Sequence, residues 1–305
     1  MAGRPGAPAR VTIPTPAAAL VTRFQAAAVE WYAVHGRDLA FRRTSEPWAV
    51  LVSEVMAQQT QAGRAAEAWT GFMDRFPTPG ALAATPVADV IRAWRGLGYN
   101  RRAVALRAAA VRIVEQHDGR VPDSLEALEA LPGIGPYTAR AVLAIAFARP
   151  VAALDTNMRR VLDRALGPLP TAPASRQSLA DSLVPGGRSA EWTHALMDIG
   201  AALCRKREPR CSDCPLLEHC SWQGSMRPDV STGKPAPRFE STSRWLRGRI
   251  IDRLREAPPA AWLTFDGPVG THALDAVVRA LDGLQRDGLL ERSNEDPRQA
   301  RLIGG

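Results

Sequence analysis

The chain has 305 residues, of which 46% are hydrophobic and 23% are charged, a balance that excludes disorder throughout and leaves room for two folded domains. No apolar run reaches the roughly 18 residues that a membrane helix needs, and the apolar stretch 17–21 is too short for a signal-peptide core, so we expect a cytoplasmic protein that does not bind membranes. The net charge of +8 favours a polyanionic partner such as nucleic acid.

The order of helix breakers along the chain predicts a leader, a long helical region, a linker and a small last domain. Residues 1–23, rich in Pro and Ala, are predicted to be a flexible leader. In residues 24–223 apolar residues recur at spacings of three and four, and no alternating strand pattern interrupts them. Residues 224–240 have the composition of a linker, so residues 241–305 are expected to fold separately.

Glu54 lies in the segment Trp48–Ala57, which is apolar on nearly every side. Helical geometry places this glutamate between Val50 and Leu51 on an apolar face. Burial of a carboxyl group favours its protonated form, so Glu54 is a candidate proton donor. The alternative is a glutamate on the helix surface, although few polar residues here could make such a surface.

The segment 131–138 separates two helical segments, 124–130 and 139–148. Gly133 and Gly135 permit positive φ and a close approach of a ligand, and Pro136 suits the first position of a helix. Backbone N–H groups at such a helix start can bind an anion. A generic helix-turn-helix would have similar glycines. Asp155 follows the second helix and could be the N-cap of the next.

The four cysteines are Cys204, Cys211, Cys214 and Cys220, with intervals of six, two and five residues. Such clustering predicts a metal site, because two disulfides within one short segment would add little stability. Four thiolates can hold zinc or an iron–sulfur cluster, and the residue types leave both open. The cationic run 205–210 lies between the first two cysteines and is either a phosphate-binding loop or a solvated charge run.

Two apolar stripes at helical spacing follow the predicted linker, the first at 245–254 and the second at 274–284. Residues 289–291 and 300–303 flank a turn-like segment and predict a hairpin after the second helix. Two helices and a hairpin resemble a winged helix. The alternative is a small module that stabilises or dimerises the chain.

The cysteine intervals and the hairpin at 131–138 resemble those of the helix-hairpin-helix DNA glycosylases related to endonuclease III, in which the four cysteines ligate a [4Fe-4S] cluster. The resemblance covers roughly residues 24–222. It implies an all-α, two-lobed core: a six-helix barrel at about 47–150, and a cluster domain built from 24–46 and 155–223. A small α+β winged-helix-like domain follows. The active site would lie in the cleft between the lobes.

The same resemblance assigns the catalytic groups. Bifunctional relatives carry a lysine one residue before the hairpin threonine, where this chain has Tyr137, so no Schiff base can form there. Asp155 corresponds to the carboxylate that stabilises the sugar cation, with Asn157 holding it and Tyr137 closing the pocket. A tyrosine at this position is found in adenine glycosylases and also in thymine mismatch glycosylases.

The segment 53–60 resembles the adenine-glycosylase motif of the MutY family, and its paired glutamines are absent from the thymine enzymes. The resemblance implies that Glu54 protonates N7 of a flipped adenine. Gln59 and Thr60 would contact the opposite 8-oxoguanine, while Tyr99, next to Leu97 and Gly98, would wedge into the base stack and offset part of the cost of opening it.

Other implied contacts surround this centre. Residues 37–42 resemble a segment near the adenine pocket, which would include Phe41 and Arg42, and Asp198 would reach the exocyclic amine; ordinary packing and surface charge are the alternative. DNA phosphates would be contacted by Gly133, Gly135, Arg205, Lys206 and Arg207. The sequence departs from the family pattern at Ala40, Phe41, Ala57, Asn100 and Thr156.

These features predict a monofunctional, monomeric adenine DNA glycosylase that acts on double-stranded DNA near the nucleoid. After residue 222 the sequence lacks the Nudix-like signature of longer relatives and resembles the module of shorter actinobacterial members. Two rivals stay open: a thymine or uracil mismatch glycosylase on the same scaffold, and a non-catalytic DNA-binding protein that carries the cluster.

Overall fold

The computed structural model describes residues 15–222 and 238–304. The chain divides into two compact units, one formed by 1–38 with 136–230 and the other by 39–135 with 231–305. Within residues 15–222 every regular element is helical, as the sequence predicts. Strands occur only in the described part after residue 238, where they form one small sheet. The predicted linker lies largely outside the described residues.

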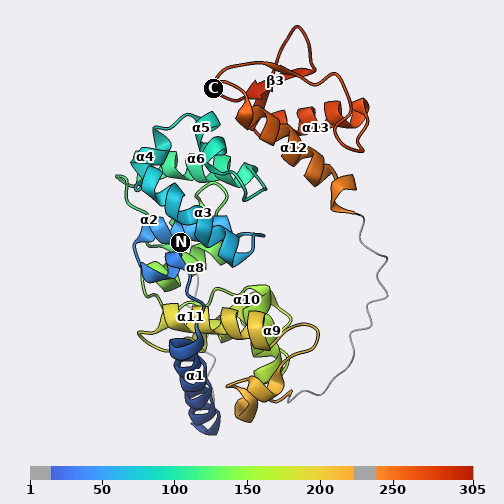
Figure 1. The fold of residues 1–305 in the computed structure, drawn as a ribbon. Helices are drawn as coiled ribbons and strands as arrows, with labels where there is room; N and C mark the ends of the chain where they lie inside the picture. The colour runs from blue at the N-terminus through green and yellow to red at the C-terminus, as the bar shows by residue number, and fades with distance from the viewer. Residues whose placement is uncertain (1–14, 223–237, 305) are drawn as a thin grey trace, which may run out of the picture. The chain divides into compact units, whose positions relative to one another are not determined.

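The first unit is built on helices α1 (Thr15–His35), α8 (Pro136–Ala146), α9 (Thr156–Leu166), α10 (Pro173–Ser182) and α11 (Ser189–Asp198), followed by a π-helix, η2 (Ile199–Leu203) (Figure 1). Short 3-10 turns, η3 (Cys211–Asp213) and η4 (Leu217–His219), follow in the cysteine segment. Phe24 of α1 packs edge-on against Trp192 of α11, with ring centroids 5.7 Å apart. Both side chains are fully buried, so this pair lies at the centre of the unit's core.

Helix α1 begins earlier than the sequence pattern indicates. The leader is predicted to extend to residue 23, but residues 15–23 are helical. The run of alanines favours a helix, and a proline is tolerated in the first turn because its missing N–H would be unpaired there. Only residues 1–14 of the predicted leader lie outside the described part of the chain.

The second unit starts with a 3-10 turn, η1 (Ala40–Arg43), and helices α2 (Pro47–Ala57), α3 (Ala62–Arg75), α4 (Pro79–Ala83), α5 (Val87–Ala93), α6 (Arg101–Gln116) and α7 (Leu125–Glu129). Helix α2 is buried along its length, from Trp48 to Met56. The carboxylate of Glu46 accepts hydrogen bonds from the N–H groups of Trp48 (3.0 Å) and Ala49 (2.6 Å) and so caps α2.

The same unit contains the C-terminal domain, with η5 (Phe239–Ser241), α12 (Ser243–Glu256), β1 (Leu263–Thr264), α13 (Leu274–Arg286), β2 (Leu290–Arg292) and β3 (Gln299–Leu302) (Figure 1). Strand β3 lies between the other two and pairs antiparallel with both. The predicted helices and hairpin are confirmed, with Leu290 opposite Leu302. Strand β1 has two residues, too few to produce a readable alternation. The domain is small, α+β and winged-helix-like.

Candidate active site

Asp155 is the N-cap of helix α9, as the sequence indicates. Its Oδ1 accepts a hydrogen bond from the backbone N–H of Met158 at 2.6 Å, and its φ of −85° and ψ of −178° are extended, which is the usual N-cap conformation. The other carboxylate oxygen accepts from the Asn157 side-chain amide at 3.0 Å. Hydrogen bonds to both oxygens thus hold the carboxylate in a fixed orientation.

Asn157 connects Asp155 to the π-helix. Its Oδ1 accepts from the guanidinium of Arg160 at 2.7 Å, and Arg160 also donates to the carbonyl oxygens of Gly200 and Cys204, each at 2.7 Å. A Cβ at Gly200 would lie only 2.7 Å from the Asn157 Cβ, so this close approach requires glycine. The sequence predicts a holding role for Asn157; the continuation through Arg160 is found only in the structure.

Glu54 is buried in α2, with 8% of its surface exposed. The alternative of a surface glutamate is therefore wrong, and the apolar run around it is the reason. The neighbouring Ser53 is also buried, and its hydroxyl donates to the carbonyl oxygen of Val50 at 2.8 Å. Glu54 belongs to the second compact unit and Asp155 to the first.

The hairpin follows α7, and α8 begins at Pro136, as predicted. Gly133 has a φ of +78°, and a Cβ there would lie 2.7 Å from the Cβ of Ala105, so both its conformation and its surroundings require glycine. Tyr137 is half-buried in the first turn of α8. Gly135 adjoins the helix start, and its Cβ position meets open space.

Arg102 connects two turns that are predicted to face DNA. Gln59 and Tyr99 lie in these turns and have positive φ values of +53° and +44°. The carbonyl oxygens of the residues just before them accept hydrogen bonds from the Arg102 guanidinium. One guanidinium nitrogen donates to the oxygens of Val55, Met56 and Gln58 at 2.5–2.9 Å. The other donates to Thr60 Oγ1 and to the oxygens of Leu97 and Gly98, at 3.0–3.1 Å.

Burial lowers the pKa of Arg102 to about 10, while the Tyr99 phenol raises it and the nearby Arg244 lowers it. The guanidinium therefore stays charged at neutral pH, as a cation shared by polar groups of both turns. Arg102 does not stand out in the sequence, because an arginine early in an amphipathic helix resembles a solvated surface charge.

Replacing Arg102 with Met is expected to lower the free energy of unfolding by about 3 kcal/mol, because several carbonyl oxygens would lose their shared donor. Urea unfolding followed by circular dichroism measures this change. Arg101→Met is the matched control, since the Arg101 side chain is 76% exposed. Equal stability of the two variants would contradict the assignment of Arg102 as the link.

Asp198 and Arg37, which the sequence places near the base pocket, form an ion pair in which the arginine side chain is 42% exposed. The Asp198 side chain is 1% exposed, and its oxygens accept from the Arg37 backbone N–H at 2.9 Å and from Arg37 Nε at 2.7 Å. Phe41 belongs to the other unit, where it packs edge-on against Trp69. Arg42 follows it in η1. A role for these residues in binding adenine stays a prediction.

The four cysteines line one pocket, together with Leu203, Arg210, Leu217 and Trp222. The Cys204 Sγ accepts from Arg164 Nη1 at 3.4 Å, and the Arg164 guanidinium lies 4.2 Å from the Trp222 ring centroid. Within residues 15–222 and 238–304, no three His, Cys, Asp or Glu side chains are grouped closely enough to hold a single ion. The four thiols line a common space.

Two thiols of this pocket, Cys211 and Cys214, have raised pKa values. Burial raises the pKa of Cys214 to about 11, and the other three cysteines raise it further, against a backbone hydrogen bond from Leu216 that lowers it. Burial also raises the pKa of Cys211. Binding of a metal centre would therefore have to displace protons. Arg205, Lys206 and Arg207 are exposed on the adjoining loop.

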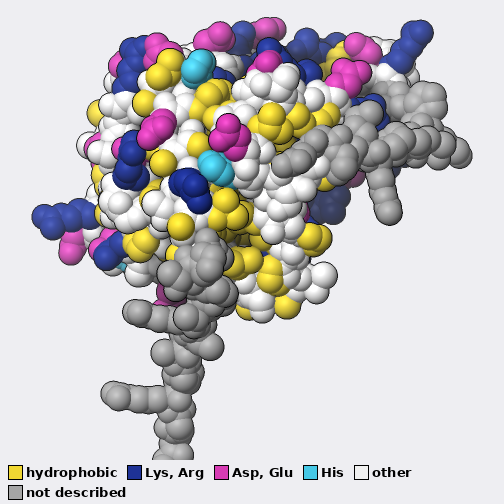
Figure 2. Space-filling model, turned by 90° about the horizontal axis from the view of Figure 1, so that it is seen from below, with side chains coloured by type: hydrophobic (Ala, Val, Ile, Leu, Met, Phe, Trp, Pro, Cys, Tyr) yellow, Lys and Arg dark blue, Asp and Glu magenta, His cyan; other side chains and the backbone are white. Residues whose placement is uncertain are grey.

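Basic side chains are spread over the face drawn in Figure 2. There, described Lys and Arg side chains alternate with acidic and apolar ones instead of forming one patch. None of the described helices is both long and apolar enough to cross a membrane.

Comparisons with known proteins agree with this arrangement. Residues 52–184 match the family model described as HhH-GPD superfamily base excision DNA repair protein. An adenine DNA glycosylase from Mycolicibacterium smegmatis is 40% identical over 87% of this chain and 92% of its own length. A thymine-DNA glycosylase from Aeropyrum pernix is 36% identical over 63% of this chain and 90% of its own. The solved structure of a thermostable thymine-DNA glycosylase is 28% identical, with a TM-score of 0.65, and covers 69% of this chain and 99% of its own.

Proposed function

The chain belongs to the adenine DNA glycosylases of the HhH-GPD superfamily, and from this premise we propose that it removes adenine paired with 8-oxoguanine or guanine in double-stranded DNA. It is an enzyme of base excision repair, and its product would be an abasic site in an uncut strand. The observation that carries the proposal is the buried carboxyl group of Glu54 in α2, four residues before the first of the paired glutamines.

The roles of the two carboxyl groups follow from their different surroundings. Glu54 sits in a helix that is buried from Trp48 to Met56, and such surroundings favour the neutral acid, which can donate a proton to the leaving base. Asp155 accepts hydrogen bonds at both oxygens and is suited to stabilise a developing sugar cation as an anion. Water then adds to the sugar carbon from which adenine departs, and the proton that this water loses balances the one that Glu54 gave to the base.

The hairpin supports hydrolysis without strand cutting. Tyr137 occupies the position at which bifunctional relatives have a lysine, and the phenol cannot form a Schiff base with the sugar. Gly133 and Gly135 would allow the backbone to approach a DNA phosphate, as would the exposed cationic loop at 205–207. The protein would act as a monomer on a flipped nucleotide.

The choice of base is tested by measuring base release from four duplexes side by side: A opposite 8-oxoguanine, A opposite G, T opposite G, and U opposite G. We expect release of adenine alone, and strand breaks only after treatment with alkali, since Tyr137 stands where bifunctional relatives have a lysine. The longer match to the adenine enzyme, which reaches into the C-terminal domain, supports this choice. Release of thymine or uracil would contradict it, and no release from any duplex would favour a non-catalytic DNA-binding protein.

The pocket lined by Cys204, Cys211, Cys214 and Cys220 fits a [4Fe-4S] cluster, because four soft thiol donors surround one space that has apolar walls. When bound, the cluster would supply a covalent tie between the two ends of the segment 204–220. The loop at 205–207 would then be held in a fixed shape.

Anaerobically purified protein is expected to contain about four iron atoms and four acid-labile sulfides per chain. Cys214→Ser should lower both and destabilise the first unit, because one ligand is lost. Ser212→Ala, at an exposed neighbouring position, should leave both unchanged. Stoichiometric zinc without sulfide in the purified chain would contradict the cluster.

A further inference from the structure

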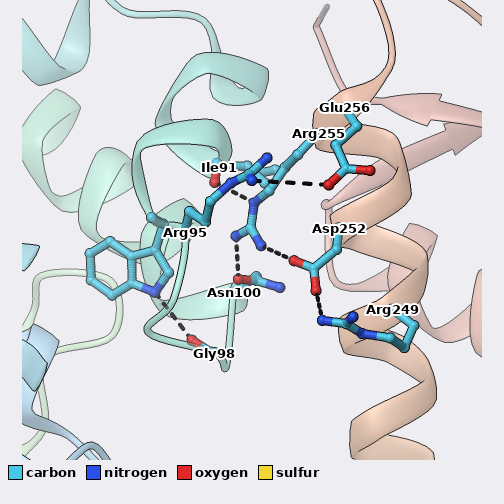
Figure 3. Close-up of polar contacts among 9 residues, drawn as sticks. Ile91, Arg95, Gly98, Asn100, Arg249, Asp252, Arg255 and Glu256 are labelled. Atoms are coloured by element: carbon cyan, nitrogen blue, oxygen red, sulfur yellow. Dashed lines mark hydrogen bonds and ion pairs between the residues drawn. The ribbon is translucent and has the colours of Figure 1, made fainter.

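The C-terminal domain is anchored to helices α5 and α6 within one compact unit. Arg255 of α12 is 8% exposed, and it donates to the carbonyl oxygen of Ile91 at 3.0 Å and to Asn100 Oδ1 at 2.8 Å. Asp252 holds the same guanidinium by an ion pair of 2.8 Å (Figure 3). Ile91 is also part of the apolar core of the C-terminal domain. The C-terminal domain is therefore attached to α5 and α6 by hydrogen bonds of Arg255 and by apolar packing around Ile91.

The other end of α12 reaches Tyr99. The Arg244 guanidinium lies 3.9 Å from the centroid of the Tyr99 ring, within the range of a cation–π contact. Arg244 and Arg255 are eleven residues apart, which is about 16 Å along a helix and close to three full turns, so both lie on the same side of α12. Because α12 is a continuous helix, the contacts that fix Arg255 also fix the position of Arg244.

The conformation of Tyr99 makes a stabilising contact such as that of Arg244 important. Tyr99 is 38% exposed, its φ of +44° is a conformation that residues other than glycine rarely adopt, and it follows Gly98. An exposed ring on a turn samples several rotamers, and inserting it into DNA would cost that freedom. A planar guanidinium stacked on the ring limits the rotamers before DNA binds.

We propose that Arg244 is a positioning residue for Tyr99, through which the C-terminal domain takes part in reading the mispaired site. This inference rests on the proposed function, since it requires Tyr99 to enter the base stack of a mispaired duplex. The domain would thereby influence discrimination between mispaired and paired DNA through the position of Tyr99. Asn100 acts in the same arrangement, because its side chain accepts from the anchoring Arg255.

The test uses the full chain and four variants: Arg244→Ala, Arg244→Lys, Tyr99→Ala and the double variant Arg244→Ala/Tyr99→Ala. Dissociation constants are measured for a duplex with A opposite 8-oxoguanine and for the same duplex fully paired. Arg244→Ala is expected to reduce the preference for the mispaired duplex roughly 2- to 10-fold, and Arg244→Lys should restore part of it. In the Tyr99→Ala background, removal of Arg244 should have no further effect on this preference.

Arg253→Ala is the matched control, since it removes the same charge from an exposed position of the same helix; it should leave the preference unchanged. Thermal midpoints of all variants establish that the fold is retained. The inference is overturned if Arg244→Ala matches Arg253→Ala, or if its effect persists undiminished without Tyr99. Failure of the proposed function would show differently, as absence of adenine release from the wild-type chain.

Discussion

Glu54→Gln is expected to slow adenine release by about 10²- to 10⁴-fold, the usual contribution of a general acid. The amide has the shape of the acid but cannot give up a proton to the departing base. Because α2 is buried around this position, bulk water cannot readily replace the lost donor. Single-turnover release from a duplex with A opposite 8-oxoguanine, at saturating enzyme, measures the chemical step without product release.

The substitution Glu54→Gln should lower only the rate of adenine release, and neither DNA binding nor stability. Exchange of the buried carboxyl group for an amide of the same size should leave the affinity for the duplex and the thermal midpoint nearly unchanged. Glu67→Gln, on the exposed face of α3, is the control and should release adenine like the wild type. An undiminished rate in Glu54→Gln would remove this residue as the acid, and with it the main physical support for the assigned reaction.

Features governed by neighbours in sequence were predictable. The apolar run around Glu54 implied burial, and the structure buries it. Asp155 preceded a helical pattern and is an N-cap. Gly133 followed Pro132 between two helices and has positive φ. In each case the cause is local backbone geometry or side-chain periodicity, and both can be read from a few adjacent residues.

Features that join distant segments were not predictable. Arg102 donates hydrogen bonds to carbonyl oxygens of residues more than forty positions earlier. Arg255 donates to the side chain of Asn100, which is 155 positions away in the sequence. Each guanidinium looks in the sequence like a surface charge on an amphipathic helix. Asn100 illustrates the point, since it stands out only as a departure from the family pattern. Its place as the acceptor for Arg255 depends on how the C-terminal domain packs.

Asp155→Asn is expected to reduce adenine release by about 10²- to 10³-fold, because the sugar cation would lose its facing negative charge. The substitution is informative because Asp155 has two roles. As N-cap it accepts from the N–H of Met158, and asparagine serves equally well as a cap. Stability should therefore be almost unchanged while the rate falls, as measured by single-turnover release and by thermal unfolding.

Asp155→Ala separates the two roles further. It removes the charge and the cap together, so it should lose activity to the same extent as Asp155→Asn but also about 1 kcal/mol of stability. Asn157→Ala, which deletes the amide that donates to the carboxylate, should have a smaller effect on the rate, because the charge remains and only its placement is loosened. If Asp155→Asn released adenine at the wild-type rate, the carboxylate would be a helix cap and nothing more, and the sugar cation would have to be stabilised by another group.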